Sequence, residues 1–284
     1  MNNQAMRVVR IEANSTSDIF AVVVQDDHEV GMPEGFAHWN GNKWSWIDKR
    51  TSWTLALNRL DNNWISVDFS GEVVEYSNGK SSKLAMGASG VNDCCVIESN
   101  LYTVGLNGLI SICNGSNWNI VPNLSRDALY SIDSTGPNTY TSGSNGIVLK
   151  ISSSESEIIH IDIDADLNAI CCCEDGQVFA AGGKENKGVI VDVITNQSFP
   201  LSTRPGFIRA SDSNEVWIVD WEGSVWLWSG ENPKLFRFAN EMSAFCLSRK
   251  KQLVFGGLDT VAIYHERSFK FVPLDLDSSF LYDE

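Results

Sequence analysis

The residues that most often carry out chemistry in proteins are few and scattered in this sequence. Its 284 residues include four histidines, none of them paired at the spacing of metal ligands. There is no G-x-S-x-G nucleophile motif, phosphate-binding P-loop, H-E-x-x-H zinc motif or EF-hand loop. We therefore predict no catalytic residue, no metal site and no cofactor, and we expect a protein that is not an enzyme.

A run of alternating acids is the first candidate for a binding site. In the segment IDIDADLN, the side chains of Asp162, Asp164 and Asp166 would lie on one side of an extended chain. Carboxylates in such an array can bind Ca²⁺, but the glycine that calcium-binding loops need for their sharp turn is missing. We therefore interpret the run as a solvated acidic connector that faces a partner.

A tryptophan between two acids is the second candidate. Trp221 follows Asp220 and precedes Glu222, and an aromatic side chain among polar neighbours can anchor a protein partner. The insertion QDDHEVGMPE adds further acids near the N-terminus. Together, the predicted partner-binding residues are Asp26, Asp27, His28, Glu29, Glu34, Asp162, Asp164, Asp166, Asp220, Trp221 and Glu222.

The cysteines do not form a recognisable disulfide or metal framework. There are seven, an odd number, and five of them occur in the runs Cys94-Cys95 and Cys171-Cys172-Cys173. Neighbouring side chains of a strand point to opposite faces, so these runs do not suit disulfide pairing or shared metal binding. We interpret them as small buried apolar residues in a reducing compartment.

An internal repeat defines the elements that must position the candidates. Each unit has a hydrophobic run, a short polar break that usually contains glycine, and a second hydrophobic run. A large apolar residue of the first run recurs at intervals of about 37–45 residues, a period typical of propeller blades. These positions are Phe20, Ile65, Tyr102, Tyr140, Phe179, Trp217 and Phe255. Two more runs flank the pair, so each unit holds four short strands.

The repeat predicts an all-β protein, a seven-bladed β-propeller with four antiparallel strands per blade. Helical periodicity is nearly absent, which excludes parallel α/β folds, and a two-sheet sandwich would not explain the repeat. Six blades with extra strands is the alternative. We expect one domain, 1–284, with blades near 6–48, 52–85, 90–122, 127–162, 166–202, 206–239 and 242–273. The acidic tail 274–284 is either loose or latched across the first and last blades.

Two segments carry a family resemblance. GLISICNGSNW from Gly108 and GFAHWNGNKW from Gly35 resemble the blade pattern of bacterial and organellar propellers with sialidase-like or photosystem-assembly-factor-like repeats. WD-repeat propellers are a looser match, because the Trp-Asp pair and the Gly-His opening of that repeat are missing. Sialidase-type Asp boxes are also absent. The resemblance therefore implies the fold and gives no support to a glycosidase activity.

The charge balance limits the possible partners. The net charge is −15 at pH 7 and the isoelectric point is near 4.6, which disfavours nucleic acids and anionic membranes. The N-terminal segment has no apolar core of a signal peptide, and no run reaches the length of about 18 apolar residues that suggests a membrane span. We expect a soluble, cytoplasmic protein that attracts basic partners.

These observations lead to one leading hypothesis and two alternatives. In a propeller, the turns between the second and third strands and the connectors between blades share one face. Acids outnumber bases there, so we predict a non-catalytic protein-binding propeller whose acidic face engages a basic protein partner. An immunity-type protein that neutralises a bacterial toxin would be a specific case. The alternatives are a glycan-binding or hydrolytic propeller with a carboxylate site at the central channel, and a scaffold subunit of a larger assembly.

Overall fold

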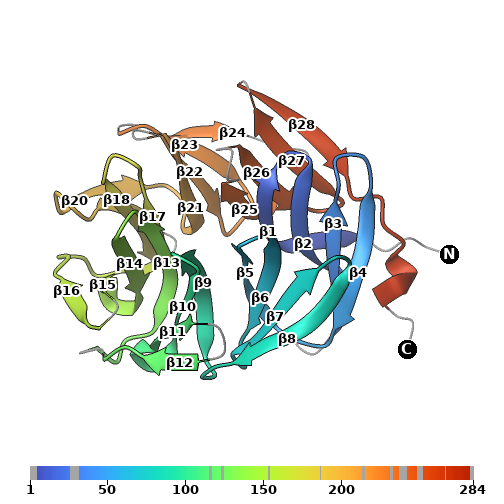
Figure 1. Cartoon of the computed structure of the whole chain (residues 1–284). Coiled ribbons are helices and arrows are strands. Elements are labelled where there is room, and N and C mark those ends of the chain that lie inside the picture. Colours follow the sequence, from blue (N-terminus) through green and yellow to red (C-terminus); the bar gives the residue numbers. More distant parts are fainter. Residues whose placement is uncertain are drawn as a thin grey trace.

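The predicted seven-bladed ring is confirmed by a computed structural model of the chain (Figure 1). Seven antiparallel sheets of four strands each follow one another around the ring. The structure describes residues 5–25, 32–114, 117–122, 125–152, 154–185, 187–212, 215–230, 233–236, 242–247, 252–265 and 267–281.

The first four blades run from the N-terminus to the middle of the chain. Blade 1 contains β1 (Met6–Ser15), β2 (Asp18–Gln25), β3 (Glu34–Trp39) and β4 (Trp44–Arg50). Blade 2 contains β5 (Thr54–Leu60), β6 (Asn63–Asp68), β7 (Glu72–Ser77) and β8 (Lys80–Met86). Blade 3 contains β9 (Val91–Ile97), β10 (Asn100–Gly105), β11 (Ile110–Asn114) and β12 (Asn117–Ile120). Blade 4 contains β13 (Leu129–Thr135), β14 (Asn138–Gly143), β15 (Val148–Ile151) and β16 (Ser156–Ile159).

The last three blades complete the ring. Blade 5 contains β17 (Asp166–Cys172), β18 (Val178–Lys184), β19 (Lys187–Asp192) and β20 (Gln197–Leu201). Blade 6 contains β21 (Pro205–Asp212), β22 (Glu215–Asp220), β23 (Val225–Trp228) and β24 (Lys234–Phe236). Blade 7 contains β25 (Met242–Leu247), β26 (Leu253–Gly257), β27 (Thr260–His265) and β28 (Ser268–Pro273). Three short 3₁₀ turns are η1 (Leu106–Gly108), η2 (Ser144–Gly146) and η3 (Ser278–Leu281).

The repeated aromatic positions pack between neighbouring blades. Phe20 stacks on Trp64 of the next blade, with ring centroids 5.6 Å apart. Trp217 packs on Phe255 and Tyr264 of blade 7 at 6.0 and 4.8 Å. A strand in the middle of a blade buries both of its faces against adjacent sheets, which explains its nearly continuous apolar sequence. The core of the ring is therefore a series of layers between blades.

Side chains of the inner strands also tie one blade to the next. Asn92 donates a hydrogen bond from Nδ2 to the carbonyl oxygen of Leu129 at 2.8 Å, and Asn168 does the same to Pro205 at 3.4 Å. Further ties of this kind join Arg10 Nε to Leu55 O, Asn58 Nδ2 to Cys94 O, and Ser243 Oγ to Val8 O. Each such bond contributes about 1 kcal/mol. Polar residues in these strands therefore serve the ring itself.

The ring closes where the first strand meets the last blade. The backbone N–H of Met6 donates to Oδ1 of Asp259, and the N–H of Asp259 donates to the carbonyl of Met6, both at 2.7 Å. Because each blade is built from consecutive strands, no strand is shared across this junction.

The C-terminal segment also spans this junction and lies on blade 1 (Figure 1). Trp46 donates from Nε1 to the carbonyl of Asp277 at 3.0 Å and stacks on Phe280 at 5.0 Å. A Cβ atom at Gly35 would clash with the ring of Trp46 and lie 2.8 Å from a methyl group of Leu281, so a larger residue here would displace the ring on which Phe280 stacks. Of the two arrangements that the sequence leaves open for the tail, the structure shows the latched one.

The cysteines and the apolar segments give two further observations. All seven cysteines are free. Burial raises the pKa of the thiols of Cys94, Cys95 and Cys246, which keeps these groups protonated and unreactive. Within the described ranges, no helix has the length and apolar character needed to cross a membrane.

Candidate binding site at the mouth of the central channel

A cavity of about 400 Å³ lies at the end of the channel where the inner strands of most blades begin. All seven blades contribute lining residues, which follow from the inner strands β1, β5, β9, β13, β17, β21 and β25 and the turn after β22. This end of the ring carries the turns between second and third strands and the connectors between blades. It is the face on which the sequence predicts the partner-binding residues.

Two partly buried carboxylates on the inner strands β9 and β13 accept hydrogen bonds from adjacent blades. Asp93 accepts hydrogen bonds from the Ser131 hydroxyl at 3.1 Å and the Ile132 N–H at 3.0 Å. Asp133 accepts from the Cys172 N–H at 2.9 Å. Burial raises the pKa of both aspartates, although these hydrogen bonds and the charge of an arginine act in the opposite direction. Their geometry is that of structural links between blades.

A guanidinium group lies among these acids. Arg209 donates from Nη1 to the carbonyl of Ile208 at 2.9 Å. Burial acts to lower the pKa of Arg209, but the negative charges of Asp133, Asp93 and Glu12 outweigh it and raise the pKa. Arg209 therefore stays charged inside the channel.

A second channel arginine donates hydrogen bonds to backbone carbonyl groups. Arg10 donates to the carbonyl of Leu55 in the next blade and to that of Val9. Its pKa is lowered, mainly by burial.

An arginine and a tryptophan form the outer part of the cavity. The side chain of Trp221 is 67% exposed, and the guanidinium carbon of Arg204 lies 5.7 Å from its ring centroid. The Nε atom of Arg204 is buried and has no hydrogen-bond partner among the described residues. Tyr130 and Phe207 also line the cavity. The mouth thus combines aromatic surface with an unsatisfied cationic donor.

The predicted acid Asp220 shapes the turn that carries Trp221. It is 5% exposed, and its carboxylate accepts hydrogen bonds from the N–H groups of Glu222 and Ser224 at 3.0 and 2.8 Å. It also accepts from the indole N–H of Trp226 at 2.8 Å. Asp220 therefore orients Trp221 and Glu222, and its own carboxylate does not face solvent.

The acid at the end of the N-terminal insertion is also turned inward. Glu34 is 1% exposed and accepts a hydrogen bond from the backbone N–H of Thr54 at 3.0 Å, which joins blade 1 to blade 2. The other predicted residues of this insertion, Asp26, Asp27, His28 and Glu29, lie outside the described residues.

The alternating acids face solvent but do not share one site. Asp162 and Asp164 are exposed in the connector between β16 and β17. Asp164 forms an ion pair with Lys184 at 2.6 Å, whereas Asp166 accepts a hydrogen bond from the backbone N–H of Asn145 at 3.1 Å. In the part of the chain that the structure describes, no group of three His, Cys, Asp or Glu residues could hold a metal ion. The run is an acidic rim.

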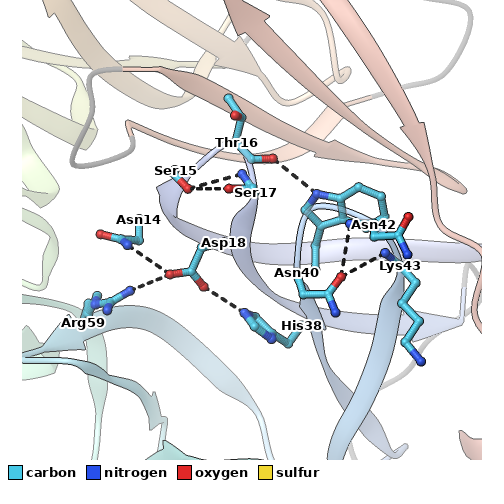
Figure 2. A network of polar contacts seen from close by, with 11 residues as sticks. Asn14, Ser15, Thr16, Ser17, Asp18, His38, Asn40, Asn42, Lys43 and Arg59 are labelled. Carbon is cyan, nitrogen blue, oxygen red and sulfur yellow. Dashed lines mark hydrogen bonds and ion pairs between the residues drawn. The ribbon is translucent and has the colours of Figure 1, made fainter.

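A polar network on the opposite face was not predicted (Figure 2). Asp18 accepts a hydrogen bond from the Asn14 amide, forms an ion pair with Arg59 at 3.0 Å, and lies 2.8 Å from Nε2 of His38. Burial acts to raise the pKa of Asp18, but these contacts together lower it. Arg59 also lies 4.9 Å from the ring centroid of Trp64. The network borders a cavity of about 560 Å³ between blades 1 and 2.

Sequence reasoning also missed the arginines of the channel. Arg10, Arg204 and Arg209 all line the mouth cavity. A usable signal exists, because Arg10 and Arg209 each directly follow two apolar residues of an inner strand. Arg204 gives no such signal, since a basic residue in a connector resembles an ordinary surface residue.

Comparisons with known proteins support the fold. No family model and no curated protein sequence matches the chain. The structure of YCF48 bound to D1 peptide is 12% identical, has a TM-score of 0.66 and covers 92% of this chain and 93% of its own. The WD40 β-propeller domain of Doa1 is 9% identical, with a TM-score of 0.72 and coverage of 94% and 95%. YCF48 from Cyanidioschyzon merolae is 11% identical, with a TM-score of 0.64 and coverage of 93% and 96%. The chain is thus a seven-bladed β-propeller with the fold that photosystem-assembly-factor and WD-repeat propellers share.

Proposed function

We propose that this chain is a non-catalytic protein-binding propeller and that the face around the channel mouth engages a basic protein partner. The observation that carries the proposal is the exposed Trp221 beside exposed acids on one face. The turn after β22 presents Trp221 and Glu222, the connector between blades 4 and 5 presents Asp162 and Asp164, and the turn after β18 presents Glu185.

Physical chemistry supports this reading in two ways. A surface rich in carboxylates attracts cationic proteins and raises their association rate, an effect strengthened here by the net charge of −15. A large aromatic side chain that is exposed in the free protein can supply the apolar anchor that charge alone does not provide. The hydrogen bonds of Asp220 hold the turn in place, so Trp221 is presented with little conformational cost.

The similar structures support the general class of function. YCF48 has been seen with a bound D1 peptide, so a propeller of comparable fold can hold a peptide. An immunity-type protein that neutralises a basic bacterial toxin domain is one specific form of the proposal. Seven free cysteines suit the reducing cytoplasm in which such a protein would act.

Affinity capture at two salt concentrations tests the proposal. The wild-type chain should retain basic proteins at about 50 mM salt and lose most of them at about 500 mM, because surface attraction is screened. Trp221→Ala and the double variant Asp162→Lys, Glu222→Lys should reduce capture of the same proteins. Glu155→Lys is the matched control, since this exposed residue lies in a turn of the opposite face.

Two outcomes would contradict the proposal. One is a set of captured proteins that is not basic or is indifferent to salt. The other is an equal loss of capture in the Glu155→Lys control, which would assign the effect to net charge and not to this face.

A further inference from the structure

The mouth cavity contains more hydrogen-bond donors than the protein uses. Among the described residues, the buried Nε of Arg204 has no hydrogen-bond partner, and Arg209 donates to the carbonyl of Ile208 alone. An arginine side chain carries five N–H donors. Within the described ranges, no carboxylate lies within ion-pair distance of the guanidinium groups of Arg10, Arg204 or Arg209.

The aspartates that line the cavity accept hydrogen bonds from other groups of the protein, and among the described residues none of them forms an ion pair with the three arginines. Asp93 receives hydrogen bonds from Ser131 and Ile132, and Asp166 receives one from Asn145. The cavity is therefore suited to a ligand that brings acceptors and negative charge. Three carboxylates, those of Glu12, Asp93 and Asp166, also line the cavity, so the anionic group is expected at Arg204, whose buried Nε has no hydrogen-bond partner among the described residues.

Apolar side chains line the same cavity. Leu55, Tyr130, Phe207 and Trp221 come from blades 2, 4 and 6 and line the cavity together with Arg204. Partial burial raises the pKa of the Tyr130 hydroxyl, with the charge of Asp166 as the next cause, so the ring is neutral at physiological pH. A volume of about 400 Å³ is within the usual range for a small organic ligand.

We propose that the mouth cavity binds an organic oxyanion, meaning a carboxylate or phosphoryl group carried on a flat apolar body. Arg204 binds the anionic group, with Arg209 below it, and Trp221, Tyr130 and Phe207 contact the apolar body. The group is supplied either by a free small molecule or by an acidic side chain of a docked protein. The site is defined without reference to the basic partner proposed above.

Calorimetric titration of the purified full chain tests the proposal. Phenyl phosphate and benzoate are the probes, and neutral benzamide and cationic benzamidine are the matched controls of similar shape. We expect the two anions to bind and the two controls not to bind. Arg204→Gln should weaken the binding of phenyl phosphate by about tenfold or more, since hydrogen bonds to charged groups are the strong ones.

Two further variants separate a binding role from a structural one. Arg126→Gln removes the same charge from an exposed connector on the same face and should leave binding unchanged. Trp221→Ala should weaken phenyl phosphate binding and leave binding of inorganic phosphate unchanged, because only the apolar body is affected. Circular dichroism melts of each variant show whether it is folded, and the exposed Trp221 keeps the test valid if Arg204→Gln does not fold.

A competition experiment between phenyl phosphate and a captured protein identifies the source of the oxyanion. If phenyl phosphate displaces a captured protein, the group comes from an acidic side chain of that protein, and otherwise it comes from a free small molecule. The proposal is overturned if neither anion binds the folded chain at about 10 mM, if Arg204→Gln binds as the wild type does, or if benzamidine binds in preference. Because the titration uses no protein partner, its failure leaves the protein-binding proposal standing.

Discussion

Two arginines in this propeller lie within 6 Å of a tryptophan ring, but the two pairs have different surroundings. Arg59 lies 4.9 Å from the ring of Trp64, and Arg204 lies 5.7 Å from the ring of Trp221. The first arginine is neutralised by Asp18, whereas the second has no carboxylate partner among the described residues. A pair that is satisfied inside the protein stabilises the junction of two blades. A pair that lacks its acceptor is available to a ligand.

Burial separates the two pairs in the same way. Trp64 is 7% exposed and stacks on Phe20, so it belongs to the core between blades 1 and 2. Trp221 is 67% exposed, and the turn that carries it is organised by Asp220. The comparison indicates that one tryptophan serves the fold and the other serves recognition.

The largest expected difference is in stability. Trp64→Ala should lower the free energy of unfolding by about 3–5 kcal/mol, because it removes a buried aromatic ring and leaves a cavity. Trp221→Ala should change it by no more than about 0.5 kcal/mol, as is usual for exposed positions. Urea unfolding followed by circular dichroism measures both. Equal losses in the two variants would break the comparison.

Most of the fold could be predicted from the sequence, because packing between blades repeats along the chain. The aromatic positions Phe20, Trp217 and Phe255 mark strands that are buried on both faces, and all three are fully buried. The latch could not be predicted, since Trp46 and Phe280 are 234 residues apart and Phe280 lies outside the repeat.

The site was less predictable than the fold, and the reason is local. Asp220 and Glu34 look like surface acids in the sequence, yet both accept backbone hydrogen bonds and are buried. Conversely, Arg204 looks like an ordinary connector residue. Whether a charged side chain faces solvent depends on backbone groups contributed by neighbouring turns and blades, which composition and spacing do not reveal.

Removing the carboxylate of Asp18, the ion-pair partner of Arg59, should have the next largest effect on stability. Asp18→Asn should destabilise the protein by about 1–2 kcal/mol, because Arg59 and His38 lose a charged acceptor at a partly buried position. Arg204→Gln should have little effect on stability, since no such pair is broken at the mouth. Thermal melts of the two variants at pH 7 compare these expectations, and a larger loss for Arg204→Gln would reverse the assignment.

The same pair should contribute a pH dependence of known sign. The contacts of Asp18 lower its pKa in the folded protein, so its stabilisation is complete above the ordinary aspartate pKa of about 3.9. It is lost as the pH falls through the lowered value of the folded state. The difference in unfolding free energy between wild type and Asp18→Asn should therefore shrink as the pH falls from about 5 to below about 4, and the comparison is made over this interval. A difference that grows on acidification would contradict the pairing.

A carboxylate introduced at the channel mouth should give Arg204 of the Arg204–Trp221 pair an acidic partner within the protein. Tyr130 lies close enough to Arg204 for that charge to influence its pKa, so Tyr130→Glu should place a carboxylate near the guanidinium group. We expect loss of phenyl phosphate binding with a change in stability of less than about 1 kcal/mol. Tyr130→Gln is the control, and it should bind more strongly than the glutamate variant. Equal binding by the two variants would show that Arg204 does not hold the anion.

The most direct measurement is a crystal structure of the full chain soaked with phenyl phosphate. Both cavities contain an arginine above a tryptophan, so one crystal compares them under identical conditions. Because the donors at the channel mouth are unsatisfied, we expect density for the phosphoryl group within hydrogen-bond distance of Arg204. The phenyl ring of the ligand should lie against Trp221, and no ligand should bind beside Arg59. Density beside Arg59 and an empty channel mouth would contradict the distinction between the satisfied and the open pair.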